Sequence, residues 1–160
     1  MPRRIQSVAG NPADSHSRPG NGSAKKGSSG SAFALDGGSH RLPVLVIEDD
    51  EATREMLRYL IESAGCSVVT AANGLDALEQ LRNGLTPGLI LLDLMMPIMD
   101  GCAFDHELAR DLQLSSIPTI VVTAFPERAA GLARHLSVVQ KPVEIDQILA
   151  LVEQYVAQHE

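Results

Sequence analysis

Two apolar runs in this chain end on carboxylates. Glu48 and Asp49 directly follow Val44–Ile47, and Asp93 directly follows Leu89–Leu92. A charge at the end of a buried strand is costly unless it has a partner. Carboxylate oxygens are the ligands that a hard cation such as Mg²⁺ prefers. The three acids therefore form a candidate metal site, and Asp93 is a candidate nucleophile that accepts a phosphoryl group as an acyl phosphate.

Two further apolar runs lead to groups that bind phosphate oxygens. Thr123 ends the run that begins at residue 119, and Lys141 follows the run 136–139 after one intervening residue. A hydroxyl can donate to a phosphate oxygen, and an ammonium pairs with it as a point charge. The carboxyl ends of parallel strands lie along one edge of a sheet, where ligands of such folds bind. The four strand ends together indicate metal-assisted phosphoryl chemistry.

Each of these residues also has an ordinary structural explanation. Acids that follow a strand can simply favour the N-terminus of the next helix. Asp93 can be a turn residue ahead of Pro97, Thr123 a plain strand end, and Lys141-Pro142 a common loop pair. The coincidence of four strand ends with complementary chemistry favours the functional interpretation over these alternatives.

The elements that must position these residues follow from hydrophobic patterning. Five apolar runs alternate with helical periodicities, which predicts an α/β fold: a doubly wound, five-stranded parallel sheet flanked by helices, of the flavodoxin-like kind. Continuous apolar strands agree, because such a sheet is buried on both faces. The strands are expected at 44–47, 68–71, 89–92, 119–122 and 136–139, with later helices near 103–112 and 127–134 and a last helix after Lys141-Pro142.

Composition divides the chain into a tail and one domain. Residues 1–40 contain seven Gly, three Pro and eight Ser, and such a segment cannot offset its ordering entropy, so a disordered tail is predicted. Residues 41–160 are long enough for one core. They carry eight Lys/Arg against eighteen Asp/Glu, which argues against nucleic acid as a partner. Without a membrane-length apolar run or a signal peptide, a cytoplasmic protein with no membrane contact is expected.

At this point the chain resembles the receiver domain of two-component response regulators, over about residues 42–158. The resemblance implies that Asp93 takes a phosphoryl group from the phosphohistidine of a sensor histidine kinase or of a phosphotransfer protein. It implies signalling to a downstream protein target rather than enzymatic turnover. The motifs that carry it are 46–51 (VIEDDE), 73–78 (NGLDAL), 93–101 (DLMMPIMDG), Thr123-Ala124 and Lys141-Pro142.

The resemblance also implies roles for individual residues. Mg²⁺ is expected to be bound by Asp49 and Asp93, by Glu48 mainly through water, and by the backbone carbonyl of Met95. Asp50 is a surplus acid and a less favoured alternative ligand. Thr123 and Lys141 are expected to contact the phosphoryl group, and the peptide bond between Lys141 and its proline is expected to be cis.

Two departures from the family pattern are visible. Val138 stands where receivers usually have Tyr or Phe as a switch residue, and the stretch from Thr123 to Lys141 is about one helical turn short, so the fourth helix is expected to be stubby. Only 18 residues follow Pro142, so the chain is expected to act alone, through protein contacts.

Two other functions compete with this interpretation. One is a receiver-like binding module that is never phosphorylated, which the altered switch position favours. The other is an aspartate-nucleophile phosphatase of the haloacid-dehalogenase type. That class needs a second acid two residues after the nucleophile as a general acid, and here that residue is Met95.

Overall fold

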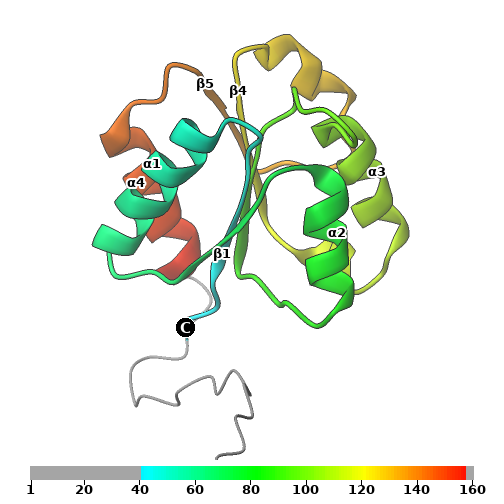
Figure 1. Cartoon of the computed structure of the whole chain (residues 1–160), viewed down its shortest axis with the longest axis horizontal. Coiled ribbons are helices and arrows are strands. Elements are labelled where there is room, and N and C mark those ends of the chain that lie inside the picture. The colour runs from blue at the N-terminus through cyan, green and yellow to red at the C-terminus, as the bar shows by residue number, and fades with distance from the viewer. Residues whose placement is uncertain (1–40, 158–160) are drawn as a thin grey trace, which may run out of the picture. The chain divides into compact units, whose positions relative to one another are not determined.

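A computed structural model describes residues 41–157 of the protein (Figure 1). The predicted tail, residues 1–40, lies outside the described residues. Strands and helices alternate along the described part of the chain. The strands are β1 (Val44–Ile47), β2 (Val68–Ala71), β3 (Leu89–Leu92), β4 (Thr119–Thr123) and β5 (Ser137–Gln140). The helices are α1 (Glu51–Ser63), α2 (Gly74–Arg82), α3 (Gly101–Arg110) and α4 (Ile145–Val156), with 3₁₀ turns η1 (Leu114–Ser116) and η2 (Pro126–Gly131).

The five strands form one parallel sheet in the order β2-β1-β3-β4-β5. Helices α1 and α4 cover one face, and α2 and α3 cover the other (Figure 1). This confirms the predicted doubly wound, flavodoxin-like architecture. Because β1, β3 and β4 lie next to one another in the sheet, the polar residues that follow them share one edge.

Each face of the sheet has its own apolar core, since successive strand residues point to opposite sides. This two-sided burial explains why the strands are apolar without interruption. One core includes Leu45, Ile47, Leu78, Ile90, Leu92, Phe104 and Val121. The other includes Val44, Val46, Leu57, Ile61, Leu91, Ile120, Ile148 and Val152.

Three helices begin at a polar side chain that caps them. Asp50, Asn73 and Asp100 each accept a hydrogen bond of 2.8 Å from the backbone N–H three residues further on. Such caps satisfy N–H groups that have no partner inside the helix. The cap at Asp100 explains why α3 begins at Gly101, two residues before the predicted start.

The connection between β4 and β5 differs from the predicted helix 127–134. A six-residue 3₁₀ helix, η2, stands there instead and ends at an extended residue, Leu132, while its N-cap residue Phe125 makes no side-chain capping bond. The short connection must return to the start of β5, and extended residues cover about twice the distance of helical ones. The expected short helix is therefore present, as a 3₁₀ helix instead of an α-helix, and it ends at Gly131, before the predicted Arg134.

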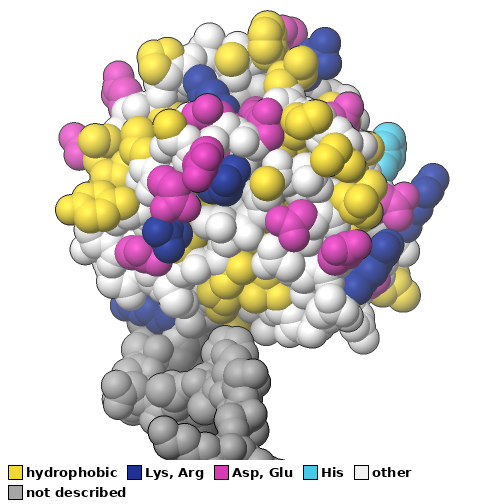
Figure 2. Space-filling model, viewed as in Figure 1, with side chains coloured by type: hydrophobic (Ala, Val, Ile, Leu, Met, Phe, Trp, Pro, Cys, Tyr) yellow, Lys and Arg dark blue, Asp and Glu magenta, His cyan; other side chains and the backbone are white. Residues whose placement is uncertain are grey.

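The surface carries many carboxylates. Acidic side chains are spread over the face shown in Figure 2, with basic side chains between them. Within residues 41–157, none of the helices combines the length and apolar character that a membrane crossing requires.

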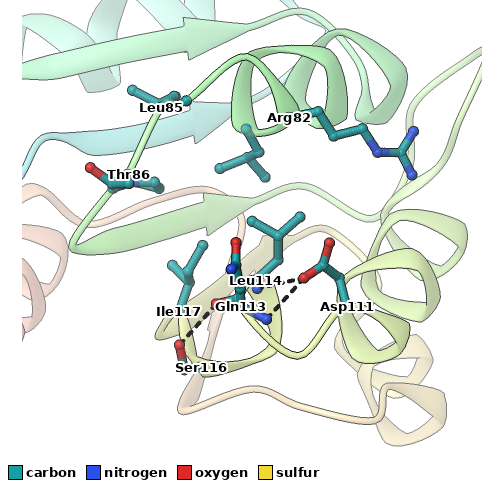
Figure 3. A pocket seen from close by; sticks show the side chains of 11 residues that line it. Arg82, Leu85, Thr86, Asp111, Gln113, Leu114, Ser116 and Ile117 are labelled. Carbon is teal, nitrogen blue, oxygen red and sulfur yellow. Dashed lines mark hydrogen bonds between the residues drawn. The ribbon is translucent and has the colours of Figure 1, made fainter.

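A cavity of about 520 Å³ lies near the amino ends of β3 and β4, between the end of α2 and η1 (Figure 3). Its apolar lining includes Leu81, Leu85 and Ile117. Asp111, at its rim, accepts hydrogen bonds from the backbone N–H groups of the following turn and so acts as a local cap. None of the candidate site residues lines this cavity, which lies at the opposite edge of the sheet from their strand ends.

Candidate functional site

Strand register places Glu48 and Asp93 side by side. Ile47 of β1 pairs with Leu92 of β3, and the backbone N–H of Asp93 donates to the carbonyl of Ile47 at 3.0 Å. The two acids therefore occupy the next position after the last paired residues of neighbouring strands. Glu48 is only 2% exposed and Asp93 only 4% exposed, so both carboxyl groups are held in a largely dry setting.

The same reasoning places Thr123 and Lys141 together. Thr123, the last residue of β4, pairs with Gln140 of β5, and the N–H of Lys141 donates to the carbonyl of Thr123 at 2.9 Å. The buried Thr123 hydroxyl accepts a hydrogen bond of 3.2 Å from the N–H of Phe125. In the described part of the chain, that hydroxyl has no hydrogen bond to the acids.

Three carboxylates meet at this edge. One oxygen each from Glu48, Asp49 and Asp93 lie within 4.8 Å of one another. Carboxylate oxygens at this spacing fit Mg²⁺, which is usually bound directly by one or two carboxylates and keeps several waters. A third carboxylate can then bind one of those waters. No other cluster of three or more acidic, histidine or cysteine ligands of this kind occurs within residues 41–157.

Lys141 reaches into the acid cluster from β5. Its Nζ lies 2.7 Å from Glu48 Oε2 and 3.3 Å from Asp93 Oδ2. Partial burial lowers the pKa of Lys141, but its hydrogen bond to Glu48 and the charges of Glu48 and Asp93 outweigh this and raise that pKa. Its ammonium therefore stays charged. The peptide bond from Lys141 to Pro142 is cis, which confirms the expectation from the resemblance.

Both carboxyl oxygens of Glu48 are already engaged. Oε2 accepts from Lys141, and Oε1 accepts from the backbone N–H of Asp50 at 3.1 Å. Burial and the nearby charge of Asp93 raise the pKa of Glu48, while the Lys141 hydrogen bond opposes this. Asp49 is exposed, and within residues 41–157 its carboxylate has no hydrogen bond.

The loop after β3 wraps closely around the backbone of Asp93. The N–H of Gly101 donates to the Leu94 carbonyl at 3.1 Å, and the N–H of Met95 donates to Asp93 Oδ1 at 3.3 Å. A Cβ atom on Gly101 would lie 2.5 Å from the Asp93 carbonyl oxygen and 2.8 Å from Leu94 Cα. Only glycine leaves room for this approach.

Asp50, the surplus acid, lies outside the cluster of three. Its carboxylate caps α1, accepting from the Thr53 N–H at 2.8 Å and from the Thr53 hydroxyl at 2.6 Å. These hydrogen bonds lower the pKa of Asp50. The less favoured alternative, Asp50 as a metal ligand, therefore finds no support in the geometry.

Two residues that support the site were missed by the sequence analysis. Arg54 donates to the backbone carbonyls of Glu48 and Asp49, and the buried carboxylate of Asp105 accepts from the Ala133 N–H at 2.7 Å. A signal existed for Arg54, because a cation near a helix N-terminus is electrostatically disfavoured and so suggests a specific partner. For Asp105, a charge on a buried helix face carried the same kind of signal.

Comparison with known proteins agrees with this fold. The response regulator receiver domain matches residues 44–153, which is most of the chain. The chain belongs to the response regulator receiver family.

Relatives and solved structures agree with this membership. The receiver is 32% identical over 119 residues to the polar-differentiation response regulator DivK of Brucella anthropi, a match that covers 70% of this chain and 94% of the relative. It is 33% identical to an uncharacterized 14.6 kDa protein of Leptolyngbya boryana, covering 72% and 90% of the two chains.

Among solved structures, the Francisella response regulator 1452 receiver domain matches with a TM-score of 0.62 at 26% identity, covering 74% of this chain and 98% of that one. The signal receiver domain of a histidine kinase from Syntrophus aciditrophicus matches with a TM-score of 0.66 at 26% identity, covering 72% and 90%. The receiver fold and its place in two-component signalling are thus established for this protein.

Proposed function

We propose that this receiver accepts a phosphoryl group on Asp93 from the phosphohistidine of a histidine kinase or phosphotransfer protein, and signals through contacts with a downstream protein. One observation carries the proposal. The Asp93 carboxylate lies between a lysine and two further acids, with Lys141 Nζ 3.3 Å from its Oδ2. A lone buried carboxylate would need only the lysine as a partner, whereas two further acids within 4.8 Å add a repulsion that a bound cation would relieve.

In the transfer step, an oxygen of Asp93 attacks the phosphorus, and the bond from phosphorus to the donor nitrogen breaks. The product is an acyl phosphate. When bound, Mg²⁺ would neutralise the charge shared by the carboxylate and the incoming group. Asp49 and Asp93 would hold it with the Met95 backbone carbonyl. Glu48, whose two oxygens already accept hydrogen bonds, is suited to holding a metal-bound water.

The β4 and β5 residues would hold the phosphoryl oxygens. Lys141 is charged and already within 3.3 Å of Asp93 Oδ2, so its ammonium can move from a carboxylate oxygen to a phosphoryl oxygen without a long displacement. The Thr123 hydroxyl accepts from the Phe125 N–H, which leaves its own proton to donate to the same group. A cytoplasmic location, where a kinase could reach the site, stays a prediction.

The test is uptake of a phosphoryl group from acetyl phosphate, followed by intact mass measurement. The full chain with Mg²⁺ should gain one phosphoryl mass, and the same chain with EDTA should gain none. Absence of uptake with Mg²⁺ would favour the receiver-like binding module, for which the aliphatic Val138 at the switch position is the supporting feature. Release of phosphate from simple esters would instead favour a phosphatase.

A further inference from the structure

The guanidinium of Arg54 turns back from α1 over the start of its own helix. Its Nη1 lies 2.8 Å from the Glu48 carbonyl oxygen and 3.2 Å from the Asp49 carbonyl oxygen. These two residues form the short link between β1 and the cap of α1. One side chain therefore fixes the backbone of both acids that follow β1.

Asp49 depends on this contact more than the other acids do. Glu48 is held through both of its carboxyl oxygens, and the backbone of Asp93 is held by its ladder bond to Ile47. The Asp49 side chain is exposed, and within residues 41–157 its carboxylate accepts no hydrogen bond. The direction in which that side chain leaves the main chain is thus set by the backbone that Arg54 holds.

Arg54 is placed where a simple surface role does not explain it. A cation in the first turns of a helix opposes the helix dipole, and Arg54 is partly buried there and forms no salt bridge with a carboxylate of residues 41–157. Two carbonyl acceptors compensate for its desolvation. Arg58, one turn later, shows the ordinary arrangement: it pairs with Glu55 at 2.6 Å, and both side chains are about half exposed.

We propose that Arg54 is a positioning residue of the metal site, which fixes the backbone of Glu48 and Asp49 so that the Asp49 carboxylate faces the cation. The inference rests on the proposed Mg²⁺-dependent function. Positioning and charge act in opposite directions here. A guanidinium beside acids weakens their attraction for a cation, whereas a fixed carboxylate strengthens binding because less order is lost when the metal binds.

The test compares Arg54→Met, Arg54→Lys and the control Arg58→Met in the full chain. Mg²⁺ affinity is measured by isothermal titration calorimetry at about 0.15 M ionic strength, where distant charges are screened. Arg54→Met should weaken binding about tenfold, as is typical when a residue that orients a metal ligand is lost. Arg54→Lys keeps the charge, but its side chain is too short to bring a nitrogen to the position of Nη1 without rearrangement, and it should also weaken binding. Arg58→Met should leave it unchanged.

A second measurement separates positioning from damage to the fold. At saturating Mg²⁺, the rate of phosphoryl uptake by Arg54→Met should return to near the wild-type rate, because the nucleophile is untouched. If Arg54→Met does not fold, the Mg²⁺ titration of Arg54→Lys is the test: weaker binding than in the wild-type chain supports the positioning role.

Tighter or unchanged Mg²⁺ binding in Arg54→Met would overturn the inference, as would wild-type affinity in Arg54→Lys. These outcomes would leave the proposed function in place as long as the wild-type chain binds Mg²⁺. A wild-type chain that binds none would overturn the proposed function, and this inference with it.

Discussion

The two halves of the site are built in different ways. On the acid half, β1 and β3 lead into α1 and α3, whose first turns are capped by Asp50 and Asp100. On the phosphate-binding half, β4 and β5 lead into η2 and α4, and neither start has a side-chain capping bond.

The difference shows where each half gets its geometry. The acid half is fixed by local contacts, such as caps, the Arg54 contacts and the close approach of Gly101. The other half is fixed by contacts between distant segments, chiefly Lys141 with Glu48, and Asp105 with the Ala133 N–H. Substitutions on the two halves should therefore have different signatures.

The largest difference between substitutions on the two halves should appear in the rate of phosphoryl uptake. Asp93→Asn removes the nucleophile, so phosphoryl uptake from acetyl phosphate should fall to background. Thr123→Ala removes one donor but leaves the nucleophile, so uptake should slow only by roughly tenfold, the worth of one hydrogen bond. Intact mass measurement over time checks both. Equal rates in Asp93→Asn and the wild-type chain would contradict the assignment of Asp93.

The next contrast concerns packing. Gly101→Ala should destabilise the fold by about 3 kcal/mol, because its Cβ would collide with the backbone of Asp93 and Leu94. Gly131→Ala, at the end of η2, is the matched control, since no atom lies within 4 Å of its added Cβ. Urea denaturation gives both free energies of unfolding. Similar losses in the two variants would show that the halves are packed alike.

The contact between α3 and the β4–β5 connection should be worth less. Asp105→Ala removes the acceptor of the Ala133 N–H, and we expect a loss of about 1 kcal/mol with faster hydrogen exchange at the Ala133 amide. Asp105→Asn retains an acceptor oxygen and serves as the control. Unchanged exchange at Ala133 in Asp105→Ala would mean that the connection is held by other contacts.

A severalfold effect is expected on the life of the acyl phosphate. Met95 and Phe125, two residues after Asp93 and Thr123, are both about 40% exposed at the carboxyl edge, and neither offers a group that orients water. Phe125→Glu should speed decay of the phosphorylated protein severalfold, as a carboxylate can orient the attacking water. Phe125→Leu, which stays apolar, should not. Equal decay in both variants would rule out shielding by Phe125.

The smallest expected effect is a pH-dependent one at the cap of α1. Hydrogen bonds from Thr53 lower the pKa of Asp50 from its ordinary 3.8, so its contribution to stability is present above that pH and is lost as pH falls through the lowered value. Asp50→Asn keeps a capping oxygen but does not titrate. The wild-type chain should therefore have the higher urea midpoint at pH 7, and the difference should shrink as pH falls below 3.8 and through the lowered pKa of Asp50.

The comparison also explains what could be predicted from the sequence. The acids of the first half directly follow apolar runs, so strand ends placed Glu48, Asp49 and Asp93 at one edge without knowledge of contacts. Helical patterning near 127–134 predicted a short helix, and Arg128, Ala129 and Ala130, which favour helix locally, do lie in the 3₁₀ helix η2. The length of chain left to reach β5, together with the hydrogen bond from the Ala133 N–H to Asp105, ends that helix three residues before the predicted boundary at Arg134.

The residues that sequence reasoning missed bond to backbone atoms, which a pattern of side-chain types does not encode. Arg54 bonds to backbone carbonyls, which look the same for every residue type, so no complementary side chain pointed to it. Asp105 bonds to a backbone N–H 28 residues away. By contrast, the caps Asp50, Asn73 and Asp100 are local, and local signals can be read directly.

The ladder pairing of Ile47 with Leu92 and of Thr123 with Gln140 bears on which sequence changes such a protein can accept. Exchange of one aliphatic residue for another inside a strand leaves the register unchanged, so the side chains of the site keep their positions. Deletion or insertion of one residue in β3 would move the Asp93 side chain to the opposite face of the sheet. Strand length should therefore be far less variable than strand composition among chains that keep this chemistry, and alignment gaps should fall in the loops at the amino edge.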